Sequence, residues 1–200
     1  MKTIKEKKER ALNTKLFLKA DRCNSAKCAL IRKPYKPGPH GAKRQKRPSE
    51  YGTQLQEKQK LQITYGLGNK QLRKLFEDKE KSDILTQLER RLDRIIFLSG
   101  LAKSPRIARQ MVSHGHILLN GKKVTIPSLN IKEGDVVEIK ESSRKLKIYE
   151  DLEQMSKTHT SPEWIKVDND MFKRECVGKP QVDTGSLPFD IDIVGEFYAR

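Results

Sequence analysis

The sequence predicts an α+β protein, with a helical, basic N-terminal domain and a small domain in which two helices pack on an antiparallel sheet. Apolar residues recur at helical spacing between residues 50 and 113, and short apolar runs separated by turn residues follow from 117 to 139. Two hundred residues are enough for two small domains that each bury a core.

Charge is distributed unevenly along the chain. Lys and Arg exceed Asp and Glu by 23 to 9 in residues 1–88 and by 13 to 7 in residues 89–150, whereas acids exceed bases by 10 to 6 in residues 151–200. The net charge of +16 attracts polyanions, of which nucleic acid is the commonest that a soluble protein meets.

Residues 1–48 are predicted to form a basic extended arm and loop, in which residues 1–21 are either a frayed arm or a short helix. From Arg22 to Ser49 there are nine Lys or Arg and no acid, and prolines and glycines interrupt regular structure. A solvated loop normally mixes both signs of charge, so the densest run favours phosphate binding. This run contains Lys43, Arg44, Lys46 and Arg47.

Residues 49–88 are predicted to be a helical domain. Ser49 is placed to cap a helix over 50–65 that Gly66 ends, and a second helix starts at Asn69. Ser82 is placed to cap a third helix, whose apolar stripe continues to Ile96 and links this domain to the next.

Residues 89–150 are predicted to form the two-helix and sheet domain. Ser104 and Pro105 start its second helix, which Gly115 ends. The pair Asn120-Gly121 predicts a tight hairpin between strands 117–119 and 122–124, and a third strand follows at 136–139. In residues 151–200 we expect a short helix near 148–155 and strands at 164–167, 172–177 and 191–194, which pack back on the other domains.

Enzymatic, membrane and secretory functions are disfavoured. The sequence has no phosphate-binding G-x-x-x-x-G-K-[ST], no H-E-x-x-H and no G-x-S-x-G motif, and we expect no small-molecule substrate. No apolar run approaches the ~20 residues of a spanning helix, so no membrane contact is expected. Three cysteines do not make a disulfide framework, which indicates a reducing compartment, by default the cytoplasm.

Metal binding has weak candidates in Cys23 and Cys28. Zinc usually takes four Cys or His ligands, and the nearest further candidate is His40. The two thiols are read as a remnant of a site or as a reduced pair, and we expect neither zinc nor another cofactor.

RNA or DNA binding has positive support in the two-helix and sheet domain. Cations cluster there, and the capped helix start at Ser104 favours a phosphate. His114 and His116 are read as packing or phosphate-facing groups, and Asp93 as an ion-pair partner of the arginines before it. The clustered cations are Arg91, Arg94, Lys103, Arg106, Arg109, Lys122 and Lys123.

Several separated motifs carry a resemblance to a known family. The runs Arg90-Arg-Leu-Asp93, Ala108-Arg-Gln-Met-Val-Ser-His-Gly-His116 and Ile117-Leu-Leu-Asn-Gly-Lys122 closely resemble the RNA-binding module named after the fourth protein of the small ribosomal subunit. Lys15-Leu-Phe-Leu-Lys19, Tyr35-Lys-Pro-Gly-Pro-His-Gly41 and Glu196-Phe-Tyr198 resemble the bacterial ribosomal protein family itself.

This resemblance implies a structural constituent of the small ribosomal subunit. It implies binding to the five-prime domain of small-subunit ribosomal RNA, an early role in assembly, and a position beside the fifth small-subunit protein where messenger RNA enters, with an effect on translational accuracy. The basic run at 43–47 matches the segment implicated at that entrance.

Two departures from the family pattern concern the N-terminal region. Zinc-bearing members have an early C-x-x-C, whereas Glu6 and Glu9 occupy those places here. The chain is also about ten residues shorter than the usual pattern between Phe76 and Leu88. Pseudouridine synthases and tyrosine-charging synthetases share the module but need larger catalytic domains. A recycling or modifying factor that binds ribosomal RNA through the module remains an alternative.

Overall fold

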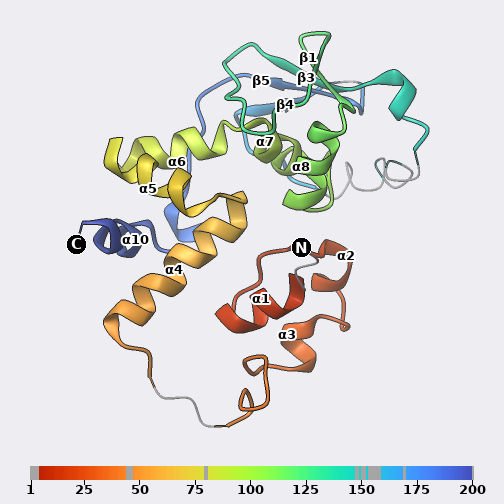
Figure 1. Cartoon of the computed structure of the whole chain (residues 1–200). Coiled ribbons are helices and arrows are strands. Elements are labelled where there is room, and N and C mark those ends of the chain that lie inside the picture. The colour runs from red at the N-terminus through yellow and green to blue at the C-terminus, as the bar shows by residue number, and fades with distance from the viewer. Residues whose placement is uncertain are drawn as a thin grey trace. The chain divides into compact units, whose positions relative to one another are not determined.

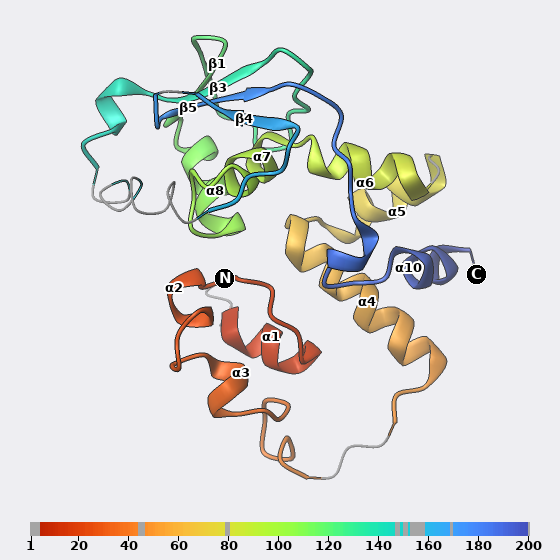
Figure 2. The ribbon, with the colours of Figure 1, turned by 180° about the vertical axis from the view of Figure 1, so that it is seen from behind.

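The computed structural model describes residues 5–43, 47–78, 81–146, 149, 152, 159–168 and 170–199. It divides into two compact units, Met1–Ile84 with Asp183–Arg200, and Leu85–Val182 (Figures 1 and 2). The boundary that we predicted after residue 88 lies close to the one between Ile84 and Leu85, whereas residues 151–200 are shared between the units. No helix in the described part of the chain is long and apolar enough to cross a membrane.

The longest helix of the first unit has the limits that its capping residues predict. In α4 (Glu50–Tyr65) the Ser49 hydroxyl accepts a hydrogen bond from the Gly52 amide, and Gly66 ends the helix at φ +62°. The helices α5 (Asn69–Asp78) and α6 (Lys81–Glu89) follow. Ser82 lies inside α6, so it does not have the capping position that we predicted.

The last helix of this unit corrects a prediction. Residues 191–194 were expected to be a strand, but they begin α10 (Ile191–Tyr198), after the short 3-10 turn η3 (Thr184–Ser186). The Asp190 carboxylate accepts hydrogen bonds from the amides of Asp192 and Ile193, and Ile191 and Val194 are buried one turn apart. A cap and a helical spacing therefore override the β-forming composition of this run, and α10 packs along α4.

The N-terminal arm has the short helix that was one of two alternatives for residues 1–21, and the segment after Arg22 is more ordered than the extended loop that we predicted. The arm contains three short helices, α1 (Lys5–Leu12), α2 (Ala20–Cys23) and α3 (Ala29–Arg32). Leu12, Leu16 and Leu18 form a small buried cluster against Ile63 of α4. Apolar contacts thus hold the arm on the helical unit despite its charge.

The single helix that we predicted from Ser82 to about Ile96, as a link between the domains, is two helices in the structure. α6 ends at Glu89 and α7 (Leu92–Leu98) begins after Arg91, which has an extended backbone. The amides of Leu92 and Asp93 donate to the carbonyls of Leu129 and Pro127, and the amide of Ile131 donates to the carbonyl of Arg90. This strand-like pairing with a distant segment takes the backbone groups that a continuous helix would need.

The sheet of this unit has five strands in the order β2-β1-β3-β5-β4, all antiparallel. The predicted hairpin of β1 (Ile117–Leu119) and β2 (Lys122–Val124) is confirmed, with Asn120 and Gly121 both at positive φ. The strands β3 (Val136–Ile139), β4 (Ile165–Val167) and β5 (Lys173–Cys176) also match predicted strands. A short 3-10 turn, η1 (Glu141–Ser143), follows β3.

The core of this unit lies between one face of the sheet and the helices α7 and α8 (Pro105–Ser113), as both views of the ribbon show (Figures 1 and 2). Leu92, Ile96 and Met111 from the helices meet Ile117 and Ile139 from the strands, all at most 1% exposed. The helix predicted near 148–155 lies outside the described residues, apart from Tyr149 and Leu152, which are buried in this core. The α+β architecture is confirmed.

Candidate nucleic-acid interface

Two arginines project from the outer side of α8. The Ser104 hydroxyl accepts a hydrogen bond from the Ile107 amide and Pro105 occupies the first turn, so the predicted helix start is confirmed. Arg106 is exposed, and the Arg109 side chain is 43% exposed, while the opposite side of the helix is buried in the core. α8 thus presents two cations at the surface of the second unit.

A buried carboxylate connects this surface to the core. Asp93, only 7% exposed, accepts hydrogen bonds from Nε and Nη2 of Arg91 at 3.0 and 2.7 Å. Nη1 of Arg109 lies 3.8 Å from the same carboxylate. Asp93 is therefore the ion-pair partner that we predicted, and it links a buried arginine with a surface arginine.

Arg91 and Arg94, which we predicted to bind RNA, do not lie on the exposed surface. Arg91 is 7% exposed and is paired with Asp93, and Nε of Arg94 lies 2.9 Å from Oε2 of Glu89, with its guanidinium over the Phe97 ring. The break between α6 and α7 turns both side chains toward carboxylates. The geometry therefore favours a role in the fold for these two arginines.

A second group of basic side chains surrounds the end of α8. The rings of His114 and His116 lie 6.0 Å apart, and the charges of Lys123 and Lys140 act on His116. Gly115 between the histidines has φ +71°, and a Cβ there would lie 2.2 Å from Cε of Lys123. The lysine stem thus covers the backbone of Gly115, and the positive φ favours glycine at this position.

The surroundings of His116 lower its pKa. Burial lowers its pKa, and His114, Lys123 and Lys140 lower it further, so the ring is held in its neutral form near neutral pH. Nδ1 of the ring lies 3.0 Å from the Ser143 hydroxyl. An anion placed here would relieve the repulsion among the surrounding cations.

The remaining predicted cations of this unit lie near the same elements. Lys122 and Lys123 are exposed on β2, which is an edge strand of the sheet. Lys103 is half-buried just before α8. The exposed members of the basic surface are therefore Arg106, Arg109, His114, Lys122, Lys123 and Lys140.

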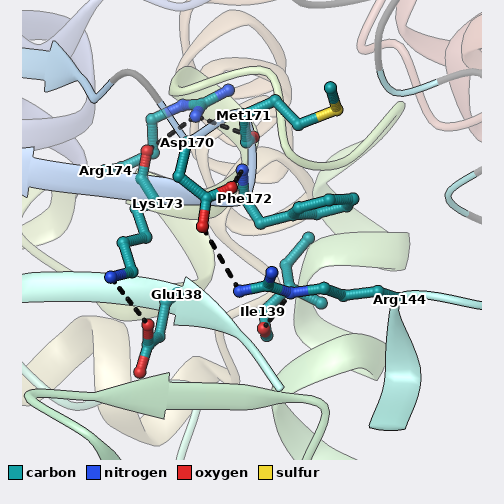
Figure 3. Close-up of polar contacts among 8 residues, drawn as sticks. All are labelled: Glu138, Ile139, Arg144, Asp170, Met171, Phe172, Lys173 and Arg174. Atoms are coloured by element: carbon teal, nitrogen blue, oxygen red, sulfur yellow. Dashed lines mark hydrogen bonds and ion pairs between the residues drawn. The ribbon is translucent and has the colours of Figure 1, made fainter. Parts of the chain in front are cut away.

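Basic residues after β3 and on β5 make their polar contacts within the protein (Figure 3). Nη2 of Arg144 lies 3.4 Å from Asp170 and its guanidinium covers the Phe172 ring, while Lys173 pairs with Glu138 at 3.8 Å. Arg174, 1% exposed, donates to the carbonyls of Ser99, Met171 and Lys173. These cations stabilise the fold and do not belong to the basic surface.

Comparison with known proteins agrees with this arrangement. Residues 1–94 match the family model described as the ribosomal protein S4/S9 N-terminal domain, and residues 90–137 match the S4 domain. The small ribosomal subunit protein uS4 of Halothermothrix orenii is 43% identical over 192 residues, which cover 93% of this chain and 92% of the relative. The proteins of the same name from Thermus thermophilus and Syntrophus aciditrophicus are 43% and 44% identical over 193 residues, with the same coverage. The chain belongs to the uS4 family.

The S4-domain match includes the basic surface of the second unit. Residues 90–137 comprise α7, α8, β1, β2 and the start of β3, and hold all its exposed cations except Lys140. The strands β4 and β5 lie outside this match, yet they complete the sheet of this uS4 member.

The basic run of the N-terminal arm is only partly described. Lys43 and Arg47 are exposed, whereas Arg44 and Lys46 lie outside the described residues. Their predicted RNA contacts stay predictions.

The zinc site that the family resemblance implies does not fit the residues present in this uS4 member. Oε1 of Glu9 accepts hydrogen bonds from the amides of Leu16 and Leu18 at 3.1 and 3.2 Å, and Sγ of Cys23 lies 3.6 Å from it. Burial raises the pKa of the Cys23 thiol, and the Glu9 carboxylate raises it further, which disfavours the thiolate that zinc requires.

Glu6, the second glutamate at the early ligand positions, is also engaged. Oε1 of Glu6 lies 3.0 Å from Arg22 and 3.9 Å from Lys19. Within the described ranges, no three His, Cys, Asp or Glu side chains come together as a metal site. The Glu9 carboxylate is thus occupied by the amides of Leu16 and Leu18 and by the Cys23 thiol.

Sequence reasoning missed two features of the second unit, one in the basic surface and one in the fold. Lys140 joins the basic surface because its amide donates to the His116 carbonyl across the sheet, a contact that follows from pairing β3 with β1. Arg174 was not distinguished from surface cations, since strand alternation alone does not show that its side chain faces the end of α7.

Proposed function

We propose that this chain is a structural constituent of the small ribosomal subunit, which binds the five-prime domain of small-subunit ribosomal RNA and acts early in assembly. The observation that carries the proposal is the group of exposed cations on α8, the following turn and β2, within the residues that match the S4 domain. Membership of the uS4 family supports the ribosomal setting, and thus the cytoplasm.

The mechanism is electrostatic and geometric. Cations that neutralise backbone phosphates release counterions, so affinity falls steeply as salt rises. Arg and Lys dominate the surface, which suits recognition of RNA shape and backbone more than reading of bases. The protein thus acts as a scaffold, and no catalytic step is assigned to it.

Replacing Arg106 and Arg109 together with alanine is expected to weaken binding to a five-prime-domain ribosomal RNA fragment. Each lost phosphate contact reduces the slope of log K against log salt by about 0.7–0.9. Filter binding at several salt concentrations measures both quantities, with an unrelated structured RNA of equal length beside it. The double variant Lys132→Ala/Lys166→Ala is the control, because these lysines are exposed elsewhere on the same unit.

Unchanged affinity and slope in the Arg106/Arg109 variant would remove α8 from the interface. Equal affinity of the natural chain for both RNAs would contradict specific recognition altogether. A recycling or modifying factor gains no support from the relatives described above, which are named as a small-subunit protein. One copy in each purified small subunit would separate a constituent from such a factor, which binds substoichiometrically.

We also propose that the segment 43–47 contacts messenger RNA where it enters the small subunit, beside the fifth small-subunit protein. Support comes from its charge and from the exposure of Lys43 and Arg47. Replacing the four cations of this segment with alanine is expected to slow translation of strongly structured messages more than unstructured ones, with normal subunit assembly. Equal translation of both message types would contradict this role.

We further propose that the chain folds and functions without zinc. The Glu9 network supports this proposal, because a carboxylate bonded to two amides and facing a protonated thiol performs the cross-linking that a metal would supply.

A further inference from the structure

The turn between α7 and α8, residues 99–103, leads directly into the basic surface of the second unit. Its second residue, Gly100, has φ +74°, a conformation that favours glycine, and Ser104 caps α8 directly after the turn. Because α8 carries Arg106 and Arg109, the conformation of this turn sets the direction in which both arginines leave the unit.

A buried arginine of β5 binds this turn. Nε of Arg174 donates to the Ser99 carbonyl at 3.1 Å. Its Nη1 donates to the carbonyls of Met171 and Lys173, at 2.9 and 2.7 Å (Figure 3). The Ser99 carbonyl lies at the C-terminal end of α7, where the helix dipole favours a cation. Arg174 therefore links β5 to a turn that lies 75 residues earlier in the sequence.

A second side chain from the later part of this unit contacts the same region. Nε2 of His159 lies 2.7 Å from the Leu98 carbonyl, and a carbonyl only accepts, so Nε2 carries the hydrogen. A Cβ on Gly100 would lie 2.8 Å from Cδ2 of this ring, so the imidazole lies against the glycine backbone. His159 and Arg174 both follow residue 137, where the S4-domain match ends. Two side chains that hold this turn therefore lie outside the matched module.

Packing alone does not explain Arg174. The side chain is 1% exposed, and burial lowers the pKa of its guanidinium. Nη2 is buried without a hydrogen-bond partner among the residues that the structure describes. An apolar side chain of similar volume is often as stable in a core as a buried charge, or more stable. A buried charge that binds particular carbonyls can instead select one conformation of the backbone.

We propose that Arg174, together with His159, is a positioning residue for RNA binding, which fixes the turn from which α8 presents its two arginines. Through Arg174, the strand β5 contributes to RNA recognition from a position inside the core. The module at residues 90–137 thus gains a fixed direction for its second helix from a part of the chain outside it. This inference rests on the proposed function, since α8 has to face RNA for its direction to matter.

The test is Arg174→Met in the full chain, which removes the donors and keeps most of the apolar volume. We expect binding to the five-prime-domain RNA fragment to weaken roughly tenfold. Amide hydrogen exchange of residues 99–109 should become faster in the free protein. The matched control is Arg144→Met, because Arg144 bonds to the Ile139 carbonyl and covers the Phe172 ring, outside the turn (Figure 3). The control should leave affinity and exchange close to those of the natural chain.

A double-mutant cycle separates positioning from a loss of folded protein. Arg174→Met is combined with Arg106→Ala/Arg109→Ala, and affinities are measured where the fluorescence of the buried Trp164 shows the unit to be folded. If Arg174 acts through α8, its replacement should weaken RNA binding much less in the chain that already lacks both arginines. Equal fold-losses in the two backgrounds would overturn the proposal, as would an unchanged affinity of Arg174→Met alone.

The variant His159→Ala keeps the proposal testable if Arg174→Met does not fold. The His159 side chain is exposed, so the core should remain intact while the Leu98 carbonyl loses its donor. We expect affinity to fall about two- to fivefold. Affinity and exchange equal to those of the natural chain would contradict control of RNA binding through this turn.

The proposed function and the positioning role can fail separately. If the natural chain binds an unrelated structured RNA equally well, the proposed function fails. Faster exchange of residues 99–109 in Arg174→Met, with unchanged exchange in Arg144→Met, would then still show that Arg174 fixes the turn.

Discussion

Replacing Asp93 with alanine is expected to lower the free energy of unfolding of the second unit by about 3–5 kcal/mol, because it leaves the buried Arg91 guanidinium without its partner. Trp164 is the only tryptophan of the chain and is buried in the core of this unit. Urea unfolding followed by its fluorescence therefore reports on this unit alone.

The double variant Arg91→Met/Asp93→Leu is the control for this measurement. It removes both charges and keeps apolar volume, so its loss of stability should be much smaller than that of the single variant. Equal losses in the two variants would mean that packing, and not the ion pair, dominates. Asp93→Ala should also weaken RNA binding, since Arg109 loses the carboxylate that orients it.

Replacing Glu9 with alanine is expected to destabilise the N-terminal arm by about 2–5 kcal/mol, because the buried amides of Leu16 and Leu18 lose their acceptor. Phe17 between them has φ +52°, a conformation that is costly for a bulky residue, and the two hydrogen bonds hold it there. Amide hydrogen exchange of residues 5–43, read by mass spectrometry, measures the effect. Glu9→Gln keeps an acceptor oxygen and should lose less.

A variant designed to gain a zinc site tests the Glu9 network by replacing its carboxylate with a metal ligand. Glu6→Cys/Glu9→Cys supplies four thiols with Cys23 and Cys28, and we expect it to bind one zinc ion at least a thousandfold more tightly than the natural chain does. Titration against a chromogenic chelator gives the affinity, and cobalt absorption shows thiolate ligation. Tight binding of one zinc by the natural chain would contradict the metal-free proposal.

Local signals in the sequence were sufficient for most elements. The caps at Ser49 and Ser104, the glycines at 66 and 115 and the Asn120-Gly121 turn act through neighbouring backbone groups, so the limits of α4, α8 and the hairpin follow from sequence. The break before α7 could not be predicted in this way, because it depends on pairing with residues 127–131.

In the candidate site, too, features set by neighbouring residues could be predicted, whereas features set by contacts between distant segments could not. Arg106, Lys122 and Lys123 are exposed as their positions on α8 and β2 predict. The burial of Arg91 follows from its pairing with Asp93, and no periodic pattern distinguishes a paired arginine from a free one. The Glu9 network also escaped the sequence reasoning, since it requires α1, the segment 16–18 and α2 to converge.

The first unit combines a segment that precedes the second unit in the sequence with a segment that follows it, and α10 of the later segment packs on α4 of the earlier one. During synthesis, α4 therefore has to wait for residues 191–198 to leave the ribosome. At about 5–20 residues per second, the intervening Leu85–Val182 takes roughly five to twenty seconds to make. The second unit can fold in that interval, so a nascent chain would have its α8 surface before α10 completes the first unit. A chain truncated before α10 would therefore bind RNA through the second unit while the first unit is incomplete.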